Sequence, residues 1–147
     1  MRIEPDRMAA WRAFLTAHRR VLDRIEADLA AADRIPLTWY DVLVELHEAP
    51  DGRLRLGELA RAVVLSHSGV TRLVDRLAGA GLLERQPDPT DRRGHFAAIT
   101  AAGEQALAHA WPVYGRGIDD YFAGRLDDAQ AAAIRDGLGA VLEALGP

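Results

Sequence analysis

Cysteine is absent from this 147-residue sequence, and lysine and asparagine are missing as well. The absence of cysteine excludes disulfides, thiolate catalysis and thiol-based sensing of metals or oxidants. No uncharged apolar run approaches the roughly 18 residues of a membrane span. The N-terminal residues include acids in place of the apolar segment of a signal peptide. We therefore expect a cytoplasmic protein that makes no use of a membrane.

The charges are unevenly distributed. The formal net charge is −4, from 22 acidic and 18 basic residues, whereas a nucleic-acid-binding domain is usually basic. However, residues 53–95 hold eight arginines and five acids, a charge of +3, and the rest of the chain carries −7. A positive segment between acidic flanks favours a surface for a polyanion. Chance clustering in an arginine-rich chain is the alternative.

The N-terminal segment predicts a long helix with one narrow apolar stripe. Apolar residues recur at steps of three and four over residues 8–32, with His18 completing the series, and such a stripe usually meets a partner helix. Pro36 should end this helix, because the residue before a proline avoids the α region. Thr38 then predicts an N-cap for a second helix over 39–49.

The C-terminal third predicts two further helices. Thr100 is placed to cap one that runs to about Phe122, and Pro112 inside it should produce a kink. Asp127, with Gln130 three residues later, is placed to start the last helix with a capping box.

The basic segment fits a helix-turn-helix over residues 56–73. We predict a short helix over 56–62 and a second helix that Ser66 caps and that runs to about Ala80. The outward face of the second helix carries hydroxyls, small residues and arginines, namely Ser66, His67, Ser68, Gly69, Thr71, Arg72 and Arg76. This face suits a recognition helix, whose first turns touch base edges in the major groove. An ordinary capped, amphipathic helix pair is the alternative.

A β-hairpin follows the helix pair and makes the pattern that of a winged helix. We predict strands over 82–86 and 94–99, with a long tip between them. At the tip, Arg92 and Arg93 can reach phosphates or enter a narrow minor groove, and Asp91 is placed to hold one of them. A solvated turn with a weak local ion pair is the alternative.

Four ordered segments resemble the signature of MarR-family transcriptional regulators. These are GVTRLVDRL at 69–77, GLLER at 81–85, PTDRR at 89–93 and ITAAG at 99–103. The resemblance implies a mainly α fold with a small β-hairpin wing: a winged helix-turn-helix lobe over 37–99, flanked by dimerisation helices over 1–36 and 100–147. It further implies a homodimer on double-stranded DNA with a pseudo-palindromic operator, commonly a repressor released by a small aromatic or phenolic effector.

Two positions depart from the family pattern. Val64 stands where the family usually has a glycine in the turn, and a β-branched residue disfavours positive φ. Gly69 is predicted to lie inside the recognition helix, where glycine costs up to about 1 kcal/mol relative to alanine.

The resemblance also implies an effector pocket near the first, second and fifth helices. The aromatic and histidine residues on these segments are Trp11, His18, Trp39, Tyr40, His47, Trp111 and Tyr114. His18 is placed to bind an anionic ligand. The alternatives are a histidine in the core or the dimer interface, and aromatic residues that belong to the core.

Other function classes find less support in the sequence. Ser66 and His67 point apart on a helix, so they form no nucleophile–base pair, and Asp41, Glu45 and Glu48 form a solvated helix face. We expect no enzyme, no cofactor and no metal, because the five histidines lie far apart and cysteine is absent. Two alternatives stay open: a metal-responsive regulator with a site across the dimer, and a winged helix that binds protein.

Overall fold

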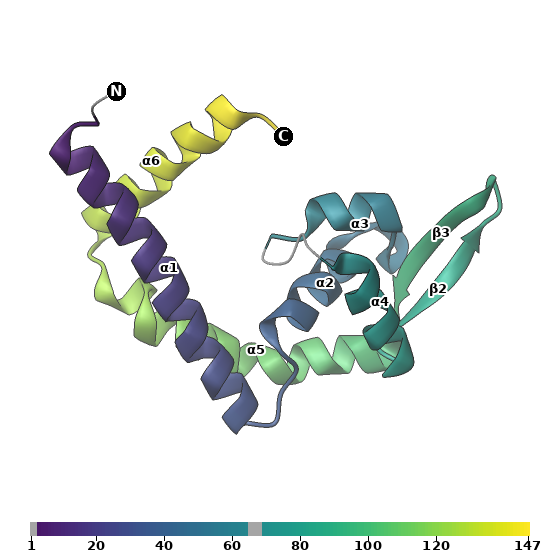
Figure 1. The fold of residues 1–147 in the computed structure, drawn as a ribbon. Helices are drawn as coiled ribbons and strands as arrows, with labels where there is room; N and C mark the ends of the chain where they lie inside the picture. Colours follow the sequence, from purple (N-terminus) through teal and green to yellow (C-terminus); the bar gives the residue numbers. More distant parts are fainter. Residues whose placement is uncertain (1–2, 65–68) are drawn as a thin grey trace. The chain divides into compact units, whose positions relative to one another are not determined.

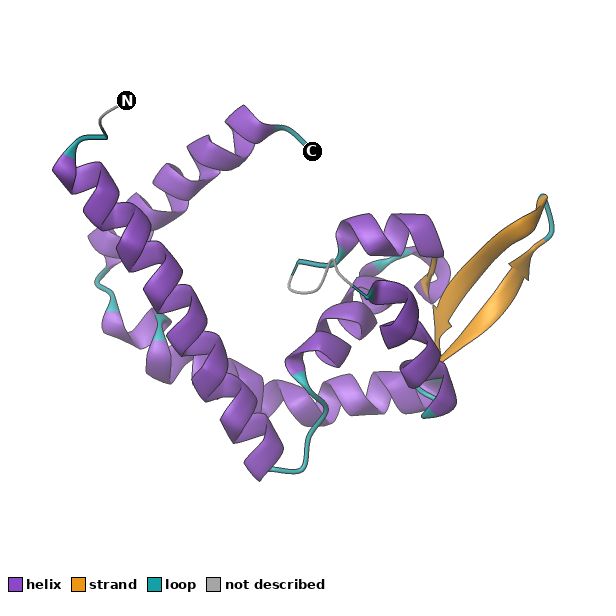
Figure 2. Cartoon of the chain, in the orientation of Figure 1, coloured by secondary structure: helices purple, strands orange, loops and turns teal. Residues whose placement is uncertain are grey.

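Helices make up most of the chain, and a small sheet interrupts them near the middle (Figure 1). The computed structural model describes residues 3–64 and 69–147. The elements of these residues are α1 (Pro5–Ala31), α2 (Leu37–Glu48), η1 (Pro50–Gly52), β1 (Arg53–Arg55), α3 (Leu56–Ala62), α4 (Val70–Gly79), β2 (Leu83–Asp88), β3 (Asp91–Ile99), α5 (Ala101–Tyr121), η2 (Ala123–Arg125) and α6 (Asp128–Leu145). The predicted fold class, mainly α with a small β wing, is confirmed (Figure 2).

The chain separates into two compact units. Residues 26–113 form one, which we call the winged unit, and residues 1–25 with 114–147 form the other, which we call the helical unit. The divisions fall within α1 and α5, so each of these helices contributes to both units. Among the described residues, no helix is both long and apolar enough to cross a membrane.

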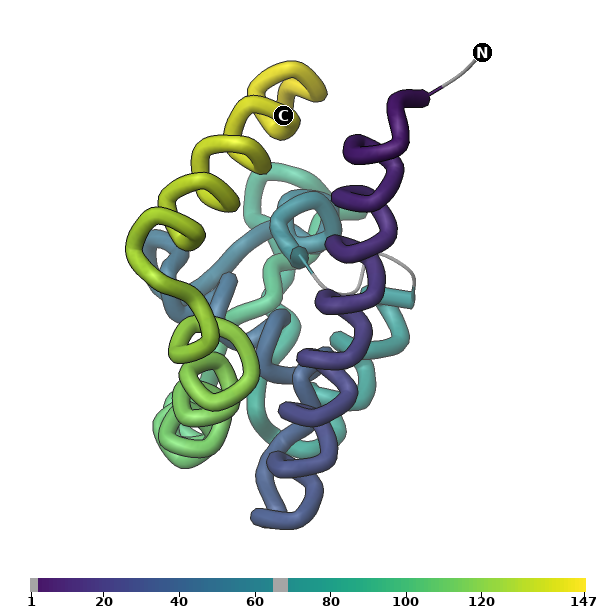
Figure 3. The backbone as a smooth tube through the Cα atoms, turned by 90° about the vertical axis from the view of Figure 1, so that its left-hand side faces the viewer, coloured from purple at the N-terminus to yellow at the C-terminus, as the bar shows by residue number. Residues whose placement is uncertain are grey.

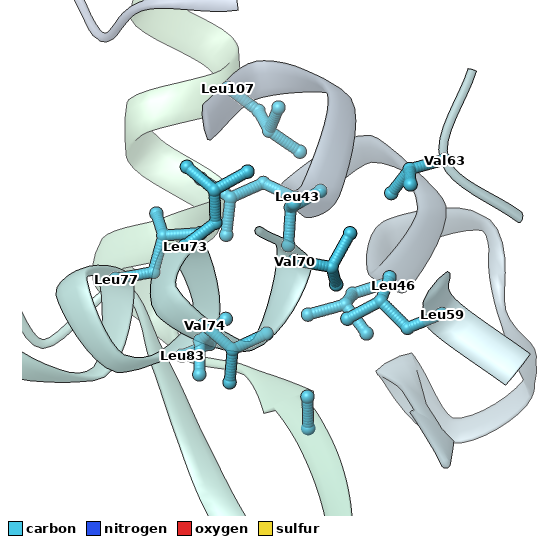
Figure 4. Packing of buried hydrophobic residues seen from close by; sticks show 12 residues of the cluster. Leu43, Leu46, Leu59, Val63, Val70, Leu73, Val74, Leu77, Leu83 and Leu107 are labelled. Atoms are coloured by element: carbon cyan, nitrogen blue, oxygen red, sulfur yellow. The ribbon is translucent and has the colours of Figure 1, made fainter. Parts of the chain in front are cut away.

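The core of the winged unit joins α2, α3, α4 and the sheet (Figure 4). Its largest fully buried side chains include Leu43 and Leu46 from α2, Leu59 from α3, Leu77 from α4 and Leu83 from β2. Each such side chain contributes about 1.5–3 kcal/mol when it is removed from water. Apolar contacts with α2 and with the sheet therefore hold the helix pair α3–α4 in place.

The sheet has three strands in the order β1-β3-β2, all antiparallel. The sequence predicted only the two strands of the hairpin. The additional strand, β1, is three residues long and pairs Arg55 with Phe96. Its pairing partner lies some forty residues later in the chain, so no local pattern marks it.

The start of α2 differs from the prediction. The helix begins at Leu37 with Pro36 at the N-cap, which offers no side-chain hydrogen bond, so the predicted cap at Thr38 is wrong. Glu26 of α1 supplies an acceptor instead, because its Oε2 receives a hydrogen bond from the backbone N–H of Leu37 at 3.0 Å. A tertiary contact thus satisfies a helix N-terminus that the local sequence leaves open.

The start of α5 explains the ITAAG segment. Thr100 Oγ1 accepts a hydrogen bond from the N–H of Gly103 at 3.2 Å and donates one to the carbonyl oxygen of Gly81 at 2.6 Å. The predicted cap at Thr100 is therefore confirmed. A side chain at position 103 would overlap the carbonyl oxygen of Leu82, so glycine allows α5 to start directly against the sheet.

In the helical unit, α6 leaves its apolar side chains uncovered. The predicted capping box is confirmed: Asp127 Oδ1 accepts from Gln130 N at 2.8 Å, and Gln130 Oε1 accepts from Asp127 N at 3.0 Å. No residue of α6 is buried. The backbones of α1 and α6 face each other (Figure 3). Side chains of the two helices, with Phe122, line a groove of about 650 Å³. It is lined by Ala10, Ala13, Phe14, Ala17, His18, Val21, Leu22, Phe122, Ala133, Ile134, Gly137 and Leu138.

Candidate nucleic-acid interface

Helix α4 begins later than the sequence predicted. Gly69 is its N-cap, with a left-handed backbone at φ 73°, and not a residue inside the helix. Glycine adopts this conformation without steric cost, so its presence here is explained by the cap. The predicted contacts Ser66, His67 and Ser68, and with them the proposed Ser66 cap, lie outside the described residues.

The two faces of α4 are chemically distinct. Its buried side carries Val70, Leu73, Val74 and Leu77. Thr71, Arg72 and Arg76 are exposed on the other side. In the part of the chain that the structure describes, neither guanidinium has an ion-pair partner. These side chains are therefore available to an external anion.

The one acid on the exposed side of α4 is paired. Asp75 Oδ1 accepts from Arg85 Nη2 of β2 at 2.7 Å. The pair reduces the negative charge next to Arg72 and Arg76, and it joins α4 to the base of the wing. An exposed pair of this kind adds only about 0–1 kcal/mol of stability, so its main effect here is electrostatic and geometric.

The wing is longer and its tip is shorter than predicted. β2 extends to Asp88 and β3 starts at Asp91, which leaves only residues 89–90 between the strands. Asp88 Oδ1 accepts from the Thr90 hydroxyl at 2.7 Å and from the Thr90 N–H at 2.9 Å. These two hydrogen bonds lower the pKa of Asp88, so the carboxylate stays ionised. The prediction of a long loop at the tip is therefore wrong.

Asp91 supports the wing through the backbone. Its Oδ1 accepts from the N–H of Arg93 at 2.9 Å, whereas the sequence predicts that it holds an arginine side chain. Gly94 lies against both wing carboxylates, since a Cβ there would be 3.2 Å from Asp88 Cβ and 3.3 Å from Asp91 Cβ. Arg92 and Arg93 are exposed at the start of β3. The tip thus presents two cations on a fixed turn.

Sequence reasoning missed two arginines that lie on β1. Arg53 and Arg55 stack on the ring of Phe96, with their Cζ atoms 4.4 and 5.4 Å from its centroid. Arg55 Nη2 is also 3.2 Å from Asp88 Oδ2. The alternation of arginine and leucine over 53–55 was the only local signal of this strand.

The residues predicted for an effector pocket are distributed over both units. Trp11, His18 and Tyr114 belong to the helical unit, and Trp39, Tyr40, His47 and Trp111 belong to the winged unit. Of the seven, only His18 lines the groove between α1 and α6.

Within the winged unit these residues have varied surroundings. Trp39 and Tyr40 pack against the core, and Trp111 is 54% exposed. His47 Nδ1 lies 2.7 Å from Glu104 Oε2, which links α2 to α5. Over residues 3–64 and 69–147, no group of three or more histidine, aspartate or glutamate side chains could hold a metal ion.

Known proteins resemble this chain in sequence and in structure. A family model described as "MarR family" matches residues 35–94. The transcriptional regulator HosA of Escherichia coli O111:H- is 38% identical over 68 residues, which are 46% of this chain and 50% of HosA. The chain therefore spans only half the length of this curated relative.

Longer matches extend the likeness over most of the chain. The uncharacterized HTH-type transcriptional regulator YkoM of Bacillus subtilis is 30% identical over 127 residues, which cover 86% of this chain and 80% of YkoM. The crystal structure of Sco3205, a MarR family transcriptional regulator from Streptomyces coelicolor in complex with DNA, has a TM-score of 0.88 and 28% identity, and the match covers 100% of this chain and 92% of Sco3205. These proteins are transcriptional regulators and not enzymes, and the chain belongs to the MarR family of transcriptional regulators.

Proposed function

We propose that this protein is a sequence-specific DNA-binding repressor. The observation that carries the proposal is the exposed face of α4, together with Arg92 and Arg93 at the wing tip. On that face, Arg72 and Arg76 have no ion-pair partner among the described residues. Both groups lie in the positive segment of an otherwise acidic chain. The likeness to Sco3205, whose crystal structure contains DNA, supports the same function.

Each group has a role that follows from its chemistry. Thr71 and Arg72, in the first turn of α4, are suited to base edges or the adjacent phosphates. Arg76 lies one turn further on and is suited to a phosphate, and Arg93, with Arg92 beside it, to a minor groove. Ser66, His67, Ser68 and Gly69 remain predicted contacts on the sequence pattern.

The test is a binding titration. A labelled duplex from the intergenic DNA beside the chain's own coding sequence, with an inverted repeat, is titrated by fluorescence anisotropy at several salt concentrations. Arg93→Ala should weaken binding and reduce the salt slope by about 1 for each bound protomer. Arg116→Ala removes the same charge from an exposed position of the helical unit and should change neither quantity. Absence of any binding at low salt would contradict the function and favour a protein-binding winged helix.

We further propose that the protein acts as a homodimer through the helical unit. The support is apolar exposure: Val141, Leu142 and Leu145 of α6 are 53%, 67% and 76% exposed. Together with the apolar groove, this is more uncovered apolar surface than a monomer usually shows. Light scattering should give twice the chain mass. Leu138→Glu should yield monomers, and Asp136→Lys, on an exposed position of the same helix, should not.

Release from DNA by a small aromatic or phenolic effector remains part of the proposal. The supporting features are His18, which lines the apolar groove, and Trp11, 55% exposed on the same helix. Monocyclic phenols and aromatic acids at millimolar concentration should quench tryptophan fluorescence and weaken operator binding together. If none of them changes either signal, this effector class is wrong, whereas the DNA-binding result stands.

A further inference from the structure

An almost completely buried carboxylate lies directly before the wing tip. The Asp88 side chain is only 2% exposed. Its Oδ1 is used by Thr90, whereas its Oδ2 receives no hydrogen bond from any residue in the described ranges. Because a buried charge is costly unless it is paired, a nearby cation adds to the stabilisation that the two Thr90 hydrogen bonds give Asp88. Arg55 Nη2, at 3.2 Å from Oδ2, supplies it.

Arg55 is held in place by the sheet itself. It lies opposite Phe96 in the β1–β3 register, and Phe96 lies opposite Gln86 in the β3–β2 register. The Arg55 guanidinium lies over the Phe96 ring, with its Cζ atom 5.4 Å from the ring centroid. Arg53, stacked on the same ring at 4.4 Å, donates to Gln86 Oε1 at 3.2 Å. Arg55 is the one of the two that reaches Asp88.

A continuous set of contacts connects Asp88 to the wing arginines. Asp88 holds Thr90 by two hydrogen bonds, and Thr90 is followed directly by Asp91, which holds the N–H of Arg93. Gly94 lies close to both acids, since a Cβ there would be 3.2 Å from Asp88 Cβ and 3.3 Å from Asp91 Oδ2. The conformation of Asp88 therefore determines the turn from which Arg92 and Arg93 project.

We propose that Arg55 is a positioning residue for the wing: by pairing with the buried Asp88 it fixes the tip turn and the direction of Arg92 and Arg93 toward DNA. This proposal rests on the proposed DNA-binding function. The competing role for Arg55 is a direct contact with a phosphate, which its 51% exposed side chain would allow.

Binding measurements separate the two roles. Arg55→Ala should weaken operator binding by about tenfold, roughly the effect of one coupled side-chain contact. In a background that carries both Arg92→Ala and Arg93→Ala, Arg55→Ala should weaken binding by less than a further twofold, because the two wing arginines that it positions are gone. If the two effects multiply and Arg55→Ala lowers the salt slope by about one further unit for each bound protomer, Arg55 contacts a phosphate and the positioning role is wrong.

Matched variants test the pair with Asp88. Arg53→Ala removes a guanidinium from the same strand and the same ring, but Arg53 forms no ion pair with Asp88 and its charge acts on Asp88 less strongly than that of Arg55. Arg53→Ala should therefore weaken binding clearly less than Arg55→Ala. Asp88→Asn keeps an acceptor for Thr90 and removes the buried charge, so Arg55→Ala should add little in that background. The proposal is overturned if Arg53→Ala and Arg55→Ala weaken operator binding equally. It is also overturned if Arg55→Ala weakens binding as much in the Asp88→Asn background as in the wild type.

Hydrogen exchange in the free protein gives a readout that does not depend on DNA. Arg55→Ala should speed exchange of the Thr90 and Arg93 amides and leave the core amide of Leu77 unchanged, which also shows that the variant folds. Arg55→Lys, which keeps the charge, should restore part of the protection. Unchanged exchange in Arg55→Ala would refute the positioning role even if the wild type binds DNA. Conversely, a wild type that binds no DNA would refute the proposed function and leave the exchange result valid.

Discussion

The buried carboxylate of Asp41 on α2 accepts a hydrogen bond from the backbone N–H of Val64, at 3.2 Å between Oδ1 and N. Val64 follows α3, and its side chain is 72% exposed. It is not among the described non-glycine residues with positive φ. The position where the family usually has glycine is therefore held by a side-chain acceptor from another helix, and a β-branched residue fits without strain.

This hydrogen bond predicts a marked effect of Asp41→Ala. The variant removes the acceptor and leaves a partly buried N–H without it, which costs about 1–3 kcal/mol. Thermal unfolding should show Tm lower by about 3–10 °C. Asp41→Asn keeps an acceptor oxygen, so its Tm should decrease less than that of Asp41→Ala. Glu48→Ala, on an exposed position of the same helix, is the control, and an Asp41→Ala variant as stable as this control would contradict the assignment.

Asp41 also shows what the sequence could not predict. The sequence predicts a solvated face for the three acids of α2, but Asp41 is buried and accepts a hydrogen bond from a residue 23 positions later in the chain. The caps at Thr100 and Asp127 were predictable, since each donor and acceptor lie within three residues. Strand β1 and the pairing of Arg55 with Asp88 were not, because their partners lie more than thirty residues away.

The contact of Gly103 with Leu82 predicts a second stability effect. Gly103→Ala would place a methyl group on a backbone carbonyl that cannot swing away, and overpacking of this kind costs about 1–3 kcal/mol or more. Gly79→Ala at the end of α4 has open space around the new Cβ and should be neutral or slightly stabilising. Denaturant unfolding of both variants measures the change in their free energy of unfolding relative to the wild type. Equal stability would mean that α5 does not start against the sheet as described.

Glu45 gives a prediction with a pH dependence. Partial burial, with Asp41 and Glu48 nearby, raises the pKa of Glu45. A carboxyl group whose pKa is raised by folding costs stability at neutral pH, and the cost disappears as the pH falls below the ordinary glutamate value of about 4.3.

Glu45→Gln should therefore raise Tm at pH 7, by about 1–2 °C if the gain is that of removing one like-charge pair four residues apart in a helix. The difference between variant and wild type should shrink as the pH falls towards the ordinary glutamate value of about 4.3. Glu84→Gln, on an exposed position of β2, is the control and should show no such trend. A Glu45→Gln gain that grows on acidification would have the wrong sign.

The last prediction distinguishes the observed position of Gly69 from the one that the sequence indicated. In a helix interior, Gly69→Ala would stabilise the protein by up to about 1 kcal/mol. At an N-cap with φ 73° the same change forces alanine into the left-handed region, which costs about 1–2 kcal/mol. Within residues 3–64 and 69–147, no atom lies within 4 Å of the new Cβ, so we expect backbone strain to decide the sign. Gly69→Asn should cost less than Gly69→Ala, because asparagine tolerates this region. Unfolding in denaturant gives the sign directly, and a stabilised Gly69→Ala would place the residue inside the helix after all.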